Sequence, residues 1–208
     1  MRKNLTLFFI GGFLFLLFVL FSYLVDKDLF YSFDFDITVK LQDKIPRRFD
    51  NFFSSFSIIG SFEVVSVFLV GFLIIKRKIL GIFVPVFYGI LHVLEIFGKV
   101  VVEHPGPPFM FFRNDIDFAF PSSHVATGYS YPSGHSARTA FISALLFLWL
   151  IKSKKLSLTQ KLFILSVIVI FDGVMLITRI YLGEHWATDV IGGILLGASL
   201  ALISTFFV

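Results

Sequence analysis

The chain has 208 residues, of which 57% are hydrophobic and 15% are charged, and its mean hydropathy is +0.89. Soluble domains carry about 25% charged residues, so this chain would expose too much apolar surface in water. The composition therefore excludes a soluble enzyme and a disordered chain, and it indicates an integral membrane protein. A net charge of +4, scattered along the chain, is too weak for nucleic-acid binding. The absence of cysteine excludes disulfides, zinc–thiolate sites and a catalytic cysteine.

Six segments are apolar enough to cross a membrane, for which a helix needs about 20 residues. The first follows Arg2 and Lys3 and lacks a cleavage site of small residues, so we expect an uncleaved signal anchor. The predicted spans are 5–24, 55–75, 79–102, 135–151, 162–182 and 186–208. We therefore predict an all-α, integral-membrane bundle of six transmembrane helices, which forms a single domain over residues 1–208.

Basic residues are denser in the loops on one side of the predicted membrane, and such loops lie in the cytoplasm. The basic clusters at 76–78 and 152–155 fall on the same side as the N-terminus. We therefore expect a multi-pass protein of the cell membrane with both termini in the cytoplasm.

The outer loop 26–54 has an amphipathic pattern. Four apolar residues recur at intervals of four, with charged residues between them: Ile37, Leu41, Ile45 and Phe49. This pattern predicts a helix on the outer membrane face between spans one and two, which Pro46 would end or kink. The second long outer loop, 103–132, is rich in Pro, Gly, Ser and aromatic residues and predicts no regular structure.

The predicted topology gathers ionisable side chains at the outer ends of spans three to six. They are Lys99, His135, Arg138, Arg179, His185 and Asp189. Such groups are costly in a membrane and usually face the bundle interior or a water-filled cavity. We therefore expect one polar site on the outer, periplasmic or extracellular, side.

The cationic residues of this site suit a phosphate group. Arg179 offers paired donors to phosphate oxygens, and Lys99 adds a point charge. Ser133 and Gly134 open a helix, where free backbone N–H groups favour an anion. The alternative is a set of snorkelling cations and capping groups at the membrane interface.

The remaining residues suit nucleophilic catalysis. His185 and Asp189 are spaced i, i+4, so they share a helix face. A carboxylate on one imidazole nitrogen leaves the other nitrogen free to attack. His135 is a candidate donor of a proton to a leaving oxygen.

These motifs resemble those of the type 2 phosphatidic acid phosphatase family, membrane relatives of the vanadium haloperoxidases. That family carries a lysine motif, then Pro-Ser-Gly-His, then Arg-x5-His-x3-Asp. Here the second motif is Pro132–His135, and the third runs from Arg179 through His185 to Asp189. The resemblance spans most of the chain and implies a six-helix bundle with its site on the outer face.

The resemblance also implies a role for each site residue. His185 is the nucleophile that forms a phosphohistidine, Asp189 orients it, and His135 protonates the leaving group. The phosphate is held by Lys99, Ser133, Gly134 and Arg179. No metal or other cofactor is expected, because cationic side chains neutralise the phosphate charge.

The implied function is hydrolysis of a phosphomonoester or diphosphate lipid. Undecaprenyl diphosphate, phosphatidylglycerophosphate and phosphatidic acid are candidate substrates, and no obligatory protein partner is expected. A phosphotransferase would use the same residues. An anion transporter or binding protein is a further alternative, although the inverted repeats and broken helices typical of transporters are not visible.

The first motif departs from the family pattern, which is Lys-x6-Arg-Pro. Gly106 stands seven residues after Lys99, so the arginine is absent. Arg138 and Arg113 are the candidates to replace it, and a weakened enzyme is the alternative. We favour Arg138, because a helix places a side chain more reliably than a loop.

Residues 121–124 read Pro-Ser-Ser-His, a near copy of Pro132–His135. Only His135 is followed at once by a predicted span, so we assign the second motif to His135 and expect 122–124 to be loop. Other polar residues inside the spans are expected to form hydrogen bonds between helices or buried pairs: Glu63, His92, Glu95 and Asp172. Glu95 lies one turn before Lys99 in the same span and is a candidate to pair with it. Gly193 and Gly197 are expected to permit close helix packing within the bundle.

Overall fold

The computed structural model describes residues 2–76, 83–114, 120 and 128–207, and these residues contain helices but no strand. The helices are α1 (Arg2–Asp26), α2 (Tyr31–Lys44), α3 (Asp50–Ser57), α4 (Phe62–Lys76), α5 (Phe83–Val101), α6 (Gly134–Lys152), α7 (Leu158–Tyr181) and α8 (Ala187–Ser204). Within the described residues, five helices are long and apolar enough to cross a membrane, and the bent pair of segments around α3 and α4 makes up to six spans. The prediction of an all-α membrane bundle is therefore confirmed.

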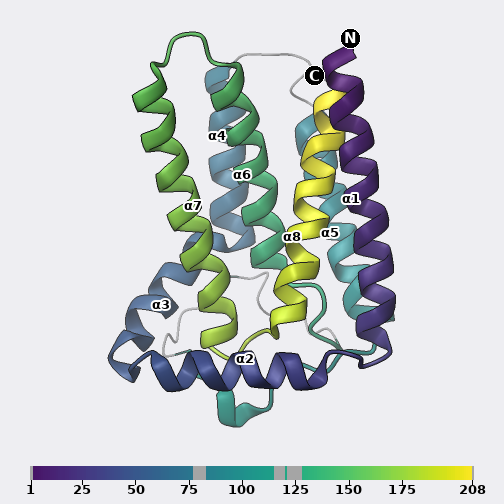
Figure 1. The fold of residues 1–208 in the computed structure, drawn as a ribbon, viewed down its shortest axis with the longest axis vertical. Coiled ribbons are helices and arrows are strands. Elements are labelled where there is room, and N and C mark those ends of the chain that lie inside the picture. The colour runs from purple at the N-terminus through teal and green to yellow at the C-terminus, as the bar shows by residue number, and fades with distance from the viewer. Residues whose placement is uncertain (1, 77–82, 115–119, 121–127, 208) are drawn as a thin grey trace.

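The long helices run side by side, and α2 lies across one end of the bundle (Figure 1). Both termini lie at the opposite end, together with the connection between α6 and α7. Helix α8 packs against α6 and α1, which makes it the central element of the bundle.

Two glycines of α8 allow its close approach to α6. A Cβ atom at Gly193 would lie 2.4 Å from the backbone oxygen of Ser133, and one at Gly197 would lie 2.0 Å from that of Ala137. Any side chain at these positions would push the two helices apart. The expected packing within the bundle is confirmed, and it brings the start of α6 beside the start of α8.

Most helix ends lie within a few residues of the predicted spans. Helix α7 is an exception, because it begins at Leu158 instead of at position 162. Ser157 accepts a hydrogen bond from the backbone N–H of Gln160, and the Gln160 side chain accepts one from the backbone of Ser157. This capping box adds a turn that hydropathy does not detect. Residues 79–82, at the start of the third predicted span, lie outside the described residues.

The prediction of one continuous helix over 55–75 is wrong. Helix α3 ends at Ser57, a 3-10 turn covers Ile58–Gly60, and Ser61 is extended before α4 begins. The segments on the two sides of the break are bent by 49°. The hydroxyl of Ser61 accepts from the backbone N–H of Val64 at 3.4 Å, so it caps a new helix. The break frees the carbonyl of Gly60 for use in the site.

The predicted outer helix exists as α2, and Pro46 in extended conformation follows its end, as expected. Its apolar stripe, however, packs on the protein. Ile37 and Leu41 contact the buried cluster of Ile180, Ala187 and Val190 from α7 and α8. Helix α2 therefore closes the end of the bundle, and it also buries two polar residues there, Asp34 and Thr38.

Candidate active site

Most of the predicted site residues lie at the ends of four helices, at the end of the bundle that α2 crosses (Figure 1). His185 lies in the loop between α7 and α8, so the prediction that it shares a helix face with Asp189 is wrong. Lys99 lies in the last turn of α5, and His135 and Arg138 lie at the start of α6. Arg179 lies in the last turn of α7, and Asp189 lies in the first turn of α8.

A backbone hydrogen bond joins the second and third motifs. The N–H of Ser133 donates to the carbonyl oxygen of Asp189 at 3.0 Å. Ser133 is fully buried and makes no side-chain cap bond to α6. The Ser133 hydroxyl instead interacts with that of Ser136 at 3.1 Å. The first backbone N–H groups of α6 are therefore left for an anion.

His185 and Asp189 form a buried pair. The Nδ1 atom of His185 lies 3.2 Å from Oδ2 of Asp189, which also accepts from the backbone N–H of Trp186 at 3.0 Å. This contact uses Nδ1, so Nε2 is the nitrogen available for attack. Burial, followed by the positive charges of Lys99 and Arg179, lowers the pKa of His185 well below its ordinary value of 6.5. The imidazole is therefore neutral near pH 7, as a nucleophile must be.

The loop that carries His185 is folded back onto α7. Its backbone N–H donates to the carbonyl oxygen of Arg179 at 3.2 Å. Gly183 has a φ of +69°, and a Cβ atom there would lie 2.1 Å from the backbone oxygen of Phe111. Glycine is favoured here for two reasons: the backbone has a positive φ, and a side chain would clash with the backbone of Phe111.

Arg179 is completely buried, with 0% of its surface exposed. One end of its guanidinium pairs with Glu184. Its Nε and Nη1 atoms make no hydrogen bond within the described part of the chain. Buried donors without partners are costly unless a ligand uses them. The sequence analysis missed Glu184, although it directly precedes His185.

Glu95 links two cations of the site. Its carboxylate lies 3.5 Å from Nζ of Lys99 and 3.1 Å from Nη1 of Arg138, and Nδ1 of His92 lies 3.2 Å away. The expected pair between Glu95 and Lys99 is confirmed, and Arg138 is an additional partner. One carboxylate between two cations leaves one net positive charge on this group of three side chains.

Arg138 is held close to His135. Its Nε atom donates to the carbonyl oxygen of Gly60 at 3.0 Å, and its Nη2 atom lies 3.5 Å from Nδ1 of His135. A Cβ atom at Gly134 would meet the carboxylate of Glu95, so glycine here lets Glu95 keep its position between α5 and α6. His135 also lies within electrostatic range of His185, Arg179 and Lys99.

Arg113 has different partners. It donates to the hydroxyl of Tyr181 at 3.2 Å and to the carbonyl oxygen of Gln42 at 3.1 Å. Its guanidinium also stacks over the Tyr181 ring, 5.0 Å from the centroid. These contacts join the loop to α2 and α7. Residues 121–127, which include His124, lie outside the described residues.

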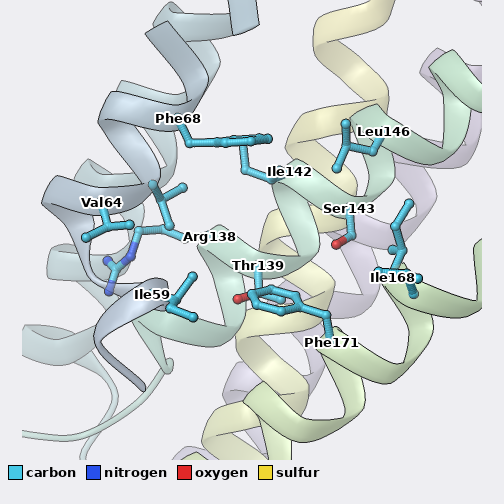
Figure 2. Close-up of a pocket in the computed structure, with 12 residues that line it drawn as sticks. Ile59, Val64, Phe68, Arg138, Thr139, Ile142, Ser143, Leu146, Ile168 and Phe171 are labelled. Atoms are coloured by element: carbon cyan, nitrogen blue, oxygen red, sulfur yellow. The ribbon is translucent and has the colours of Figure 1, made fainter. Parts of the chain in front are cut away.

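An apolar cavity of about 410 Å³ lies between α4, α6 and α7. Its lining includes Val64, Phe68, Ile142 and Phe171, and Arg138 lies at one end (Figure 2). Ser143, also in the lining, donates to Asp172 at 2.7 Å, which confirms the expected bond between helices for Asp172.

The family model that matches this chain is that of the PAP2 superfamily, over residues 79–208. The chain belongs to this superfamily. The matched segment contains Lys99 of the first motif and the complete second and third motifs, and the resemblance found in the sequence is confirmed.

Individual PAP2 relatives agree with this assignment. Phosphatidylglycerophosphatase B of Bacillus subtilis (strain 168) is 35% identical over 81 residues, which cover 39% of each chain. The crystal structure of a transmembrane PAP2-type phosphatidylglycerolphosphate phosphatase from Bacillus subtilis has a TM-score of 0.72 at 21% identity, over 93% of each chain. That of LpxE from Aquifex aeolicus has a TM-score of 0.61 at 26% identity, over 83% of this chain and 94% of LpxE. The fold is therefore that of PAP2 membrane proteins.

Proposed function

We propose that this protein is a membrane lipid phosphatase, which hydrolyses a phosphomonoester or diphosphate lipid through a phosphohistidine intermediate. The observation that carries the proposal is the buried guanidinium of Arg179. Two nitrogens of Arg179 make no hydrogen bond within the described residues. The charge of Arg179 acts on His185, and Nδ1 of His185 contacts Asp189. An anion transporter would not need this oriented imidazole. The PAP2 relatives from Bacillus subtilis are named as phosphatidylglycerophosphate phosphatases, which agrees with a lipid substrate.

The reaction proceeds in two steps. The Nε2 atom of His185 attacks phosphorus, and the bond from phosphorus to the lipid or diphosphate oxygen breaks. His135 gives its proton to that oxygen. Water then attacks the phosphohistidine, His135 takes a proton from this water, and the bond between phosphorus and Nε2 breaks to release phosphate and restore His185.

We propose that His135 carries out both proton transfers through Nε2. Its Nδ1 atom faces Nη2 of Arg138 at 3.5 Å. His135 gives up its proton as the imidazolium, a form that the negative charge of a bound phosphate favours. Lys99, Arg138, Arg179 and the N-terminus of α6 neutralise the transferring phosphoryl group. We propose that the reaction needs no metal for this reason.

The apolar cavity supports a lipid substrate. Arg138 lies at one end of it, and the remaining lining is almost entirely hydrocarbon. A chain bound there would place a phosphate beside Arg138 while its tail stayed in an apolar environment. We propose that the head group reaches the site from the outer leaflet.

The first experiment measures phosphate release from a panel of lipid phosphates and diphosphates in detergent, with and without chelator. We expect release in the presence of chelator, loss of turnover in His185→Ala, and a smaller loss in Asp189→Asn. Residual activity of His185→Ala within about tenfold of wild type, or ~1.4 kcal/mol, contradicts the nucleophile assignment. Activity that chelator abolishes and magnesium restores contradicts the metal-free reaction.

The cavity is tested by filling it. We expect Ile142→Trp to lower turnover of lipid phosphates and to spare a small water-soluble phosphomonoester. Val169→Trp is the matched control, because Val169 is exposed on α7 and does not line the cavity. Equal loss on both substrates contradicts a role in holding the lipid chain.

A further inference from the structure

A second polar cluster lies next to Asp189, and the mechanism above does not use it. It consists of Asp34 of α2, Thr188 of α8 and His104, which follows α5. All three side chains are buried, with exposed fractions of 2% for Asp34, 0% for Thr188 and 6% for His104. A cluster of this kind has to be accounted for, because buried polar groups are costly unless they are paired.

Asp34 holds the start of α8 from outside the main bundle. Its Oδ1 atom accepts from the backbone N–H of Thr188 at 2.8 Å, and its Oδ2 atom accepts from the Thr188 hydroxyl at 2.6 Å. A carboxylate at a helix N-terminus is favoured both by the free N–H groups and by the helix dipole. Helix α2 is therefore fastened to the residue that directly precedes Asp189.

His104 lies between the two carboxylates. Its Nε2 atom is 3.3 Å from Oγ1 of Thr188, 3.6 Å from Oδ1 of Asp189 and 3.7 Å from Oδ2 of Asp34. The Thr188 hydroxyl donates its hydrogen bond to Asp34, so its oxygen can only accept from His104. Nε2 of His104 is then the protonated nitrogen, and it lies beside Asp189. The backbone of His104 is itself anchored, because the N–H and hydroxyl of Ser130 both bond to its carbonyl oxygen at 3.0 Å.

The buried carboxylates of Asp34 and Asp189 lie close together, so a hydrogen-bond donor between them is favourable. Burial is the main cause that raises the pKa of Asp34 to about 6, and the nearby carboxylate of Asp189 adds to it, although bonds from Thr188 oppose the rise. Oδ2 of Asp189 serves His185 and Trp186, whereas Oδ1 is buried and makes no hydrogen bond of ordinary geometry in the part of the chain that the structure describes. Two side chains face Asp189 here: His104, whose Nε2 atom lies 3.6 Å from Oδ1, and Ser130, whose hydroxyl bond of ordinary geometry goes to the carbonyl oxygen of His104.

We propose that His104 and Asp34 are positioning residues, which act through Asp189 to hold His185 in its attacking orientation. His104 fixes Oδ1 of Asp189, and this keeps Oδ2 directed at Nδ1 of His185. Asp34 fixes Thr188 and His104, so the outer helix α2 belongs to the catalytic apparatus. This inference rests on the proposed function for its kinetic consequences, but the geometry it describes is independent of turnover.

The kinetic test compares His104→Leu, His104→Gln and Asp34→Ala with wild type. We expect His104→Leu to lower kcat at least about tenfold with little change in KM, because Lys99 and Arg179 still hold the phosphate. His104→Gln retains an N–H donor at similar reach, so it should recover part of kcat. Thr38→Val is the matched control: Thr38 is equally buried on α2, and its hydroxyl bonds to the backbone of Asp34 in its own helix.

A double-mutant cycle tests whether His104 acts through Asp189. In the Asp189→Asn background, His104→Leu should lower kcat by less than about threefold, because the orientation of His185 is already lost. An equal loss in both backgrounds, or full activity of His104→Leu in an enzyme that needs Asp189, overturns the inference and leaves the proposed function intact.

A spectroscopic readout separates this inference from the proposed function. In protein labelled with ¹⁵N-histidine, the ring nitrogens of His185 report its tautomer and its bond to Asp189. We expect His104→Leu to shift these signals in the same direction as Asp189→Asn, and Thr38→Val to leave them unchanged. Unchanged His185 signals in His104→Leu overturn the inference even in a protein that releases no phosphate.

Discussion

At the scale of single residues, the missing arginine of the first motif is the main chemical question. Glu95 and the carbonyl of Gly60 hold the guanidinium of Arg138 near His135. Arg113 instead donates hydrogen bonds to Gln42 and Tyr181. This difference in partners agrees with Arg138 as the replacement, which remains our proposal.

Substitution of the two arginines separates their roles. We expect Arg138→Ala to reduce kcat about as strongly as Arg179→Ala, because each removes one cation from the transferring phosphoryl group. Arg113→Ala should mainly lower the midpoint of thermal unfolding, because it loses contacts between the loop, α2 and α7. Full activity of Arg138→Ala together with an inactive Arg113→Ala would reverse the assignment.

Restoring the family residue gives a complementary result. A Cβ atom at Gly106 would lie 3.5 Å from Cβ of Ser130, an ordinary contact, so arginine fits at its base. Gly106→Arg should therefore partly restore kcat to Arg138→Ala. No gain in the double variant contradicts the idea that Arg138 replaces the missing side chain.

The pKa of His185 supplies a second residue-scale prediction. Because burial and nearby cations lower this pKa below 6.5, we expect the His185 NMR signals to stay those of neutral imidazole as pH falls through 6.5. In Lys99→Met the protonation should occur at higher pH, whereas Lys152→Met, at the exposed far end of α6, should not change it. The unfolded chain would bind a proton that the folded chain excludes, so this group lowers stability as pH falls below 6.5.

At the scale of elements, the contact between α6 and α8 brings the second motif beside the third motif. We expect Gly197→Ala to destabilise the protein by about 1–3 kcal/mol, because its Cβ atom would lie 2.0 Å from a backbone oxygen that cannot move aside. Gly173→Ala on α7 is the matched control, since nothing lies within 4 Å of its Cβ position. That control should be neutral or slightly stabilising in a thermal unfolding assay. Equal midpoints for the two variants would show that α6 and α8 tolerate separation.

The break between α3 and α4 has a different role. A continuous helix would use the carbonyl of Gly60 in its own hydrogen bonds. The break turns this carbonyl toward Arg138, and the absence of a side chain at Gly60 lets His135 approach. Local irregularity in a span is tolerated where protein covers it, and here it serves the site.

At the scale of the whole molecule, the two ends of the bundle differ in character. The end with α2 holds the site, and the end with the termini holds the basic loop between α6 and α7 (Figure 1). Together with the positive-inside rule, this division favours cytoplasmic termini and a site on the outer side.

The cysteine-free chain makes this orientation easy to test. We expect a membrane-impermeant maleimide to label Asp43→Cys, on an exposed position of α2, in intact cells. Lys154→Cys, in the exposed loop between α6 and α7, should be labelled only after the membrane is opened. The reverse pattern would place the site in the cytoplasm.

The sequence by itself determined the membrane class, the approximate positions of five of the six spans and the residues of the second and third motifs. Hydropathy detects spans because the membrane forces each backbone to satisfy its own hydrogen bonds within a helix. The pair of His185 and Asp189 was predicted from i, i+4 spacing, but His185 lies in the loop before α8, so the fold of that loop brings the two side chains together. Local rules did predict the end of α2 before Pro46 and the contact between Glu95 and Lys99.

Only the tertiary structure decided what surrounds these residues. Asp34 and Thr188 are 154 positions apart in the chain, and no periodicity connects them. The broken second span escaped hydropathy, because apolar residues continue through the break. The amphipathic stripe of α2 predicted a helix but not its partner, since a lipid surface and a bundle end attract the same apolar side chains. Contacts of this kind depend on where distant helices meet, which is decided by packing and not by local sequence.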